Sequence, residues 1–174
     1  MICSPNKQLI KKNIKKERKA ETQQFLSYPK TGRIRAEQEI LSQMLCGIAA
    51  SNYYKEELGF MKDETCNKLA LYIIDYYRNH QKMEVADLLN DIREENVRQL
   101  LLDISQWELA SQNINMLVLQ DALEKTKVCM LDDQIQMLNE KIKTIQDPME
   151  KAKLAQQKNQ LIKDRNDRMC QERK

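Results

Sequence analysis

The residues that most often carry chemistry are few and scattered in this chain. Histidine occurs once, as His80, and the five cysteines are Cys3, Cys46, Cys66, Cys129 and Cys170. Thiolates and imidazoles hold zinc when short spacings such as C-x-x-C bring them together, and no such spacing occurs. An odd, scattered set of cysteines is typical of reduced thiols in a cytosolic protein. The sequence therefore predicts no metal site and no cofactor.

Motifs of catalysis are equally hard to find. The sequence contains no recognisable Ser/His/Asp set, no phosphate-binding G-x-x-x-x-G-K-[ST] loop and no H-E-x-x-H. His80 stands at a predicted helix end, where a histidine commonly interacts with the helix dipole or lies at the surface. We therefore expect a non-catalytic protein that takes no small-molecule substrate.

The composition points to the elements that must carry any function. Among 174 residues there are only 3 glycines and 3 prolines, so turns are rare and the elements must be long. A charged fraction of 32% with 5% aromatic residues suits a solvated helical protein. No apolar run is long enough to span a bilayer, and no signal-peptide core is present. We expect an all-α, cytoplasmic protein without membrane contact.

The first part of the chain is basic. Residues 1–30 hold eight lysines and arginines against two glutamates, a net charge of +6, so the formal total of +3 leaves −3 for residues 31–174. We interpret residues 1–32 as a linker or tail. A weak contact with nucleic acid is the second interpretation, although the segment lacks interleaved aromatic residues.

Residues 33–112 predict a bundle of five helices joined by short connections, which are too short for parallel-sheet crossovers. Gly47 is expected to end a helix in the left-handed conformation, and Gly59 to stop the next one. Asp63 is expected to cap the helix that follows it. The first helix shows its apolar face at helical spacing, through Ile40, Leu41, Met44 and Leu45.

Residues 113–174 predict a helical hairpin. A long helix is expected over residues 115–146, and a second one from Pro148 to about Met169. Asp147 is a good N-cap and Pro148 fits the first helical position, so the chain should turn there. The second half of the long helix carries a seam with coiled-coil spacing, formed by Val128, Leu131, Ile135, Leu138, Ile142 and Ile145.

The returning helix carries a weaker apolar face, because its middle, residues 156–160, reads QQKNQ. Two interpretations stay open. The hairpin folds back on the bundle and completes one core, or it projects as an arm whose remaining apolar surface binds a partner helix.

Two stretches, RAEQEILSQML and EELGFMKDETCNKLALYII, resemble the helical domain shared by bacterial replicative helicases, at their N-terminus, and bacterial DNA primases, at their C-terminus. The tail LQDALEKTKVCMLDDQIQMLNEKIKTIQDPMEKAKLAQQKNQLIKDR resembles the closing part of the DnaG-type primase, which ends in a leucine-seamed helix, a short acidic turn and a polar return helix. The helicase would continue into a nucleotide-binding domain with a G-K-[ST] loop, which this sequence lacks. The resemblance covers roughly residues 33–169 and is carried by the order of the helices.

The resemblance implies a region that docks primase onto the N-terminal domain of the hexameric replicative helicase and modulates the helicase during priming. The parent protein would be a DNA-directed RNA polymerase, and this region of it non-catalytic. The alternatives are a nucleic-acid-binding or self-associating helical domain, or the N-terminal domain of the helicase itself. The residues that we expect to bind the partner are Leu161, Ile162, Arg165 and Met169 on the returning helix, with Leu131 and Ile135 opposite them.

Overall fold

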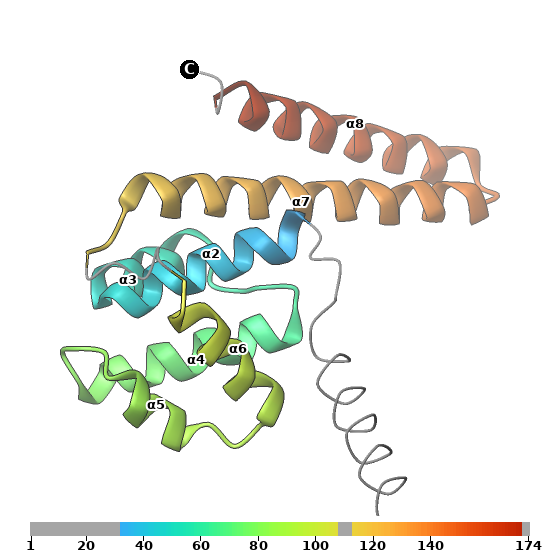
Figure 1. Cartoon of the computed structure of the whole chain (residues 1–174). Helices are drawn as coiled ribbons and strands as arrows, with labels where there is room; N and C mark the ends of the chain where they lie inside the picture. Colours follow the sequence, from blue (N-terminus) through green and yellow to red (C-terminus); the bar gives the residue numbers. More distant parts are fainter. Residues whose placement is uncertain (1–31, 108–112, 172–174) are drawn as a thin grey trace, which may run out of the picture. The chain divides into compact units, whose positions relative to one another are not determined.

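The computed structural model describes residues 32–107 and 113–171, which form seven helices and no strand (Figure 1). The predicted all-α class is confirmed. The basic segment predicted at residues 1–32 lies outside the described residues, except for Gly32. The helices are α2 (Gly32–Cys46), α3 (Ile48–Glu57), α4 (Glu64–Asn79), α5 (Val85–Asp91), α6 (Glu95–Ser105), α7 (Met116–Thr144) and α8 (Pro148–Gln171).

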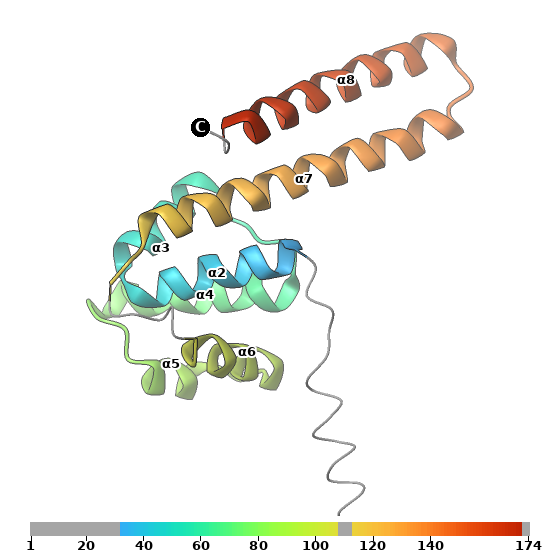
Figure 2. The same ribbon diagram turned by 45° about the horizontal axis from the view of Figure 1, so that its top comes forward.

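Helix α2 is central in the described part of the chain. It packs against α3, α4, α6 and α7, and both views place it between α7 and α4 (Figures 1 and 2). Because neighbours surround it, α2 also buries polar side chains, which need partners. The side chain of Gln43 accepts a hydrogen bond of 2.7 Å from the backbone N–H of Asn115 and so fixes the start of α7.

The opposite side of α2 is closed by α4 and α6, which pack on each other and on the short helix α5. The hydroxyl of Tyr77 donates a 3.2 Å hydrogen bond to the carbonyl of Met44 and ties α4 to the end of α2. Trp107 lies against the core, and the guanidinium of Arg35 is 4.3 Å from its ring centroid. The fully buried apolar residues of this half include Leu69, Ile73, Leu88, Val97, Leu101 and Ile104.

Within the bundle, the helix ends follow the sequence at two of the three predicted positions. The carboxylate of Asp63 accepts a 2.9 Å hydrogen bond from the N–H of Cys66 and caps α4. Gly59 has a φ of 69° and ends the turn after α3, its N–H donating to the carbonyl of Tyr54.

The prediction for Gly47 is wrong. Its φ of 170° is extended, and it is the N-cap of α3, which begins at the very next residue. Space is nevertheless tight at this position. An added Cβ would lie 3.0 Å from Cδ1 of Ile114, so the two segments approach closely here.

The first half of α7 belongs to the bundle. Leu119, Ala122 and Leu123 lie in the main core, and the side chain of Asn115 caps the helix by accepting from the N–H groups of Leu117 and Val118. The predicted division between residues 33–112 and 113–174 stays a prediction, since this core draws on both ranges.

Helix α8 returns antiparallel to α7, as both ribbon views show (Figures 1 and 2). The predicted turn is confirmed: α8 begins at Pro148, and the Asp147 carboxylate accepts a 3.0 Å hydrogen bond from the N–H of Met149. Among the described helices, α8 packs extensively on α7 alone. Helices α7 and α8 together form the hairpin.

Candidate functional site

Two ion pairs set the register of the hairpin. Arg165 of α8 donates to Asp132 of α7 at 2.9 Å, and Arg168 donates to Glu124 at 2.8 Å. In an antiparallel pair, three residues back along α8 correspond to three residues forward along α7. The first pair places Ile162 opposite residue 135 and the second places it opposite residue 130, so Ile162 lies opposite residues 130–135 of α7.

The structure brings most of the predicted partner-binding residues to this level of the hairpin. Ile135 is buried, with 9% of its surface exposed, although it lies outside the main core. The others near it are half-buried: Leu131, Leu161, Ile162 and Arg165. Met169 lies further along α8 and is 37% exposed. Their burial is consistent with packing inside the hairpin, and whether they also bind a partner stays a prediction.

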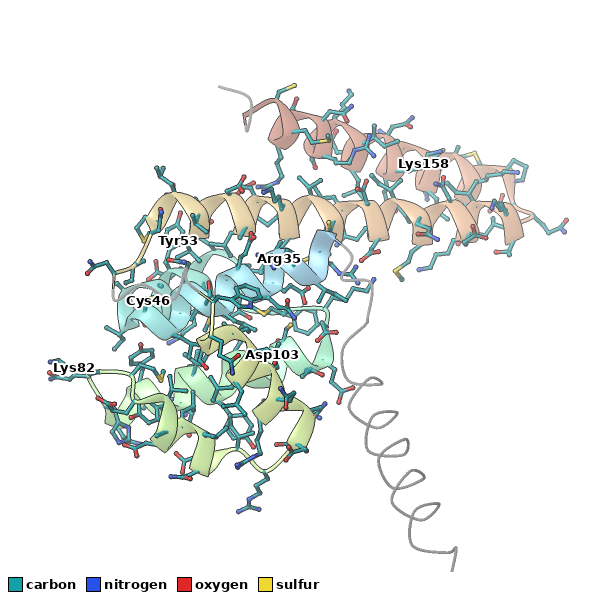
Figure 3. The ribbon with its side chains drawn as sticks, viewed as in Figure 1. Arg35, Cys46, Tyr53, Lys82, Asp103 and Lys158 are labelled. Atoms are coloured by element: carbon teal, nitrogen blue, oxygen red, sulfur yellow. The ribbon has the colours of Figure 1, made fainter. Side chains whose placement is uncertain are left out.

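A polar side chain interrupts the face of α8 that packs on α7. Lys158 is half-buried in the middle of the helix (Figure 3), where its aliphatic stem can cover apolar surface while the ammonium group reaches water. The half-buried residues recur at helical spacing on this face, as Leu154, Ala155, Lys158, Leu161, Ile162, Arg165 and Arg168. The seam is thus weaker on α8 than on α7, as the sequence predicts.

Charged residues of α7 also form ion pairs with residues of the bundle. Asp133 accepts a 2.9 Å hydrogen bond from Arg33 of α2 and pairs with Lys62, which precedes α4. Lys127 pairs with Glu57 of α3 at 2.7 Å and with Glu124 at 3.0 Å. The same helix therefore joins α8 on one side and the bundle on the other.

The carboxyl group of Glu124 stands at the centre of these contacts. Partial burial raises its pKa, but hydrogen bonds and charges from Lys127 and Arg168 outweigh this effect and hold the pKa below its usual range. Glu124 is therefore ionised at neutral pH and forms ion pairs with both Lys127 and Arg168.

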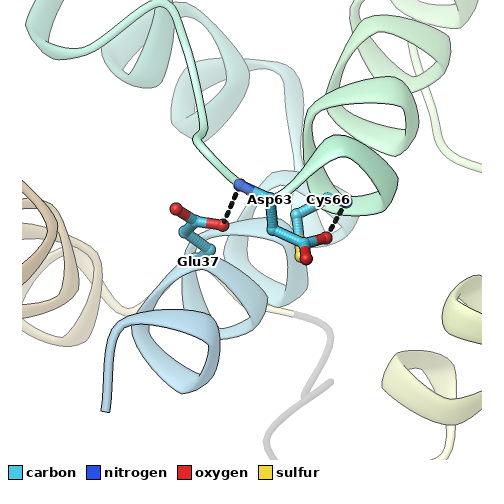
Figure 4. Close-up of side chains that lie close together, drawn as sticks. All are labelled: Glu37, Asp63 and Cys66. Carbon is cyan, nitrogen blue, oxygen red and sulfur yellow. Dashed lines mark hydrogen bonds between the residues drawn. The ribbon is translucent and has the colours of Figure 1, made fainter. Parts of the chain in front are cut away.

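A second polar group lies inside the bundle, where Glu37, Asp63 and Cys66 place potential metal ligands within 4.8 Å of one another (Figure 4). Glu37 is 0% exposed, and its two oxygens accept backbone hydrogen bonds from Lys62 at 3.1 Å and Asp63 at 3.2 Å. Asp63 in turn accepts from the N–H of Cys66. These carboxylates satisfy the donors at the start of α4, which is a structural task.

Sequence reasoning missed the role of Glu37. Burial raises the pKa of this carboxyl, while the two backbone N–H groups act in the opposite direction. One signal could have found it: Glu37 precedes Ile40, Leu41 and Met44 by three, four and seven residues and so falls on their apolar stripe. A charged residue on such a stripe needs buried partners.

A hollow of about 650 Å³ opens between the end of α2, the end of α4 and the segment before α5. Its lining is mixed, with Tyr77 and Met83 beside Cys46, Lys82 and Glu84. Burial raises the pKa of the Cys46 thiol, which disfavours the nucleophilic thiolate. This lining gives no recognisable set of nucleophile, base and orienting group.

Comparisons with known proteins found no matching family model, no matching curated protein and no matching solved structure. No helix in the described part of the chain is both long enough and apolar enough to cross a membrane. The functional interpretation therefore depends on the surfaces of the molecule and on the resemblance of its sequence.

Proposed function

We propose that this chain is a protein-interaction module that docks a bacterial primase onto the N-terminal domain of the hexameric replicative helicase and modulates that helicase during priming. The observation that carries the proposal is the position of α8, which packs extensively on α7 alone among the described helices. A helix held along one side leaves its remaining sides to a partner helix.

Two further features support this function. The stretches around Arg35 and Glu64 and the closing hairpin resemble the helicase-binding region of DnaG-type primases. The hairpin is also tied to the bundle through Asp133 and Lys127, so it can present α8 from a rigid base. Docking then needs no chemistry from the chain, and its natural location is the replication fork in the bacterial cytoplasm.

The test is binding of the full chain to a purified hexameric replicative helicase, followed by size-exclusion chromatography. We expect the full chain to co-elute with the helicase and a chain lacking residues 146–174 to elute alone. A chain lacking residues 1–30 is a control of similar length and should still co-elute. Circular dichroism must show that the shortened chains are folded.

Two results would contradict the proposal. If the full chain does not co-elute, the helicase is not its partner. If the chain without residues 146–174 binds as tightly as the full chain, the docking surface lies on the bundle.

A further inference from the structure

Two pairs of basic residues in α8 lie on different sides of the helix. Arg165 and Arg168 face α7, where Asp132 and Glu124 neutralise them. Lys153 and Lys163 are exposed, and neither has an ion pair with any residue in the described part of the chain. The charge that α8 offers to a partner therefore comes from its lysines.

These lysines lie on one continuous stripe, which we call the outer ridge. It is formed by exposed residues spaced four, three, four and three apart: Met149, Lys153, Gln156, Gln160 and Lys163. The spacing puts them on one face of the helix, opposite the half-buried stripe that packs on α7. The ridge is roughly 21 Å long at 1.5 Å per residue, a length that suits contact with another helix.

The composition of the ridge is amphiphilic. Met149 is 70% exposed at the tip of the hairpin, where its flexible thioether side chain can adapt to an apolar contact. A shallow hollow of about 400 Å³ lies among Lys153, Gln156, Gln157 and Gln160. Two acids lie near the end of the ridge: the amide of Gln160 donates to Asp164 at 2.9 Å, and exposed Asp167 lies four residues after Lys163 on the same face. Residues 149–163 nevertheless hold four lysines against one glutamate.

We propose that the outer ridge docks on an acidic helical face of a protein partner. This inference rests on the proposed function and names the surface and the chemistry of the contact. Lys153 and Lys163, about 15 Å apart along the helix, pair with carboxylates at a similar spacing on the partner. The glutamine amides between them donate to and accept from polar groups of that face, and Met149 inserts at its end.

The seam inside the hairpin cannot serve this purpose without opening, because α7 already covers much of it. Docking through the ridge depends instead on electrostatic attraction. This attraction acts over a long range and speeds association with the partner, and added salt weakens it. Nucleic acid is the competing ligand for exposed lysines. The ridge favours a protein because it carries no aromatic side chain on which bases could stack.

The test uses the full chain with Lys153→Glu and Lys163→Glu together. The matched control is Lys55→Glu with Lys82→Glu, two exposed lysines of the bundle without an ion pair in the described part of the chain. Binding to the hexameric replicative helicase is measured by calorimetry at about 0.1 M and about 0.5 M salt. Circular dichroism checks that both variants keep their helices.

We expect the ridge variant to lose about tenfold or more in affinity and the control to stay within about twofold of the unmodified chain. The unmodified chain should lose more affinity on addition of salt than the ridge variant does. The neutral variant, Lys153→Gln with Lys163→Gln, should fall between the two.

Three results would overturn the inference. If the unmodified chain does not bind the helicase, the proposed function and the ridge both fall. If the unmodified chain binds but the ridge variant has the same affinity as the control, the outer ridge is not the docking surface, while the proposed function stands. If the ridge variant keeps helicase binding but loses affinity for a single-stranded oligonucleotide in fluorescence anisotropy, the ridge is a nucleic-acid surface.

Discussion

Arg168 of α8 and Glu124 of α7 form a hydrogen-bonded ion pair of 2.8 Å, and Glu124 continues the chain of charges through Lys127 to Glu57 of α3. Four charged side chains thus connect three helices through pairs that are 44 and 70 positions apart in the sequence. All four side chains are at least partly exposed, so each ion pair contributes little to the free energy of unfolding. The pairs instead help to fix how the helices are oriented against one another.

Glu124→Gln should loosen the end of α8 with little effect on the bundle. Exposed ion pairs contribute roughly 0.5–1 kcal/mol each, so the free energy of unfolding should change by about that amount. Hydrogen exchange at residues 165–171 should become faster. Glu140→Gln is the control, because Glu140 pairs only with Lys143 of its own helix among the described residues.

The same contact should respond to acid. Because the pKa of Glu124 is lower in the folded protein, its stabilising effect is present above the ordinary glutamate pKa and is lost as the pH falls through the folded value. The protection of α8 against hydrogen exchange, corrected for the intrinsic pH dependence of amide exchange, should therefore decrease in acid for the unmodified chain. An identical pH profile for Glu124→Gln would contradict this assignment.

Glu37→Gln should destabilise the bundle. An amide can accept only one of the hydrogen bonds from Lys62 and Asp63, and it turns its own donors toward the other N–H group. We expect a loss of about 1–3 kcal/mol in urea unfolding at neutral pH. Glu56→Gln, at an exposed position of α3, is the control and should change stability by less than about 0.5 kcal/mol.

The pH dependence of Glu37 has the opposite sign to that of Glu124. Its pKa is raised in the folded protein, so the part of its contribution that depends on protonation is fully present below the ordinary glutamate pKa and is lost as the pH rises through the folded value. The hydrogen bonds from the two backbone N–H groups remain at neutral pH. The Gln variant should remove this part of the profile. A profile that matches the unmodified chain would show that another group titrates there.

The helix ends could be predicted wherever one residue decides them. Asp63, Asp147 and Gly59 act through their own side chain or backbone, and all three behave as the sequence predicts. Gly47 fails because its conformation depends on where the chain goes next. Its place against Ile114, 67 positions later, cannot be read from local residues.

Gly59→Ala should cost more than Gly47→Ala. The φ of 69° at Gly59 is unfavourable for any residue with a Cβ, and the expected loss is about 1 kcal/mol. At Gly47 the backbone is extended, and the new Cβ meets the end of a flexible Ile114 side chain that can move. Thermal unfolding of the two variants, side by side, checks the order. A larger loss at Gly47 would mean that Ile114 is held in place.

Removing the whole hairpin should be far more damaging than removing α8. A chain that ends at residue 112 loses Leu119 and Leu123, which are at most 1% exposed, together with Ala122. Each large buried side chain is worth about 2–5 kcal/mol, so the loss approaches the total stability of a domain. A chain that ends at residue 145 keeps these residues and should still unfold cooperatively in circular dichroism. A cooperative transition in the shorter chain would place the core within residues 33–112.

The direction of the hairpin seam could be predicted only in part. The spacing of Leu131, Ile135 and Leu138 identifies one apolar face on α7. It cannot tell whether that face meets α8 or an outside partner, since both would use the same residues. The ion pair of Asp132 with Arg165 shows that α7 packs on α8, and that of Asp133 with Arg33 shows that it also packs on α2. The partners are separated by 33 positions in the first pair and by 100 in the second.

Ile162→Asp should detach α8 from α7. The side chain is half-buried opposite residues 130–135 of α7, and a carboxylate there loses apolar contact and approaches the charge of Asp132. We expect a loss of about 2 kcal/mol, which corresponds to roughly thirtyfold faster hydrogen exchange across residues 148–171. Asn159→Asp adds the same charge at an exposed position of the same helix and should leave exchange unchanged.

Helicase binding of Ile162→Asp should also fall, because a detached single helix is marginally stable in water and the outer ridge loses its shape. The ridge variant separates the two effects, since Lys153→Glu with Lys163→Glu should weaken binding while the exchange of α8 stays slow. If Ile162→Asp weakens binding with unchanged exchange, Ile162 itself contacts the partner and the docking face includes the seam.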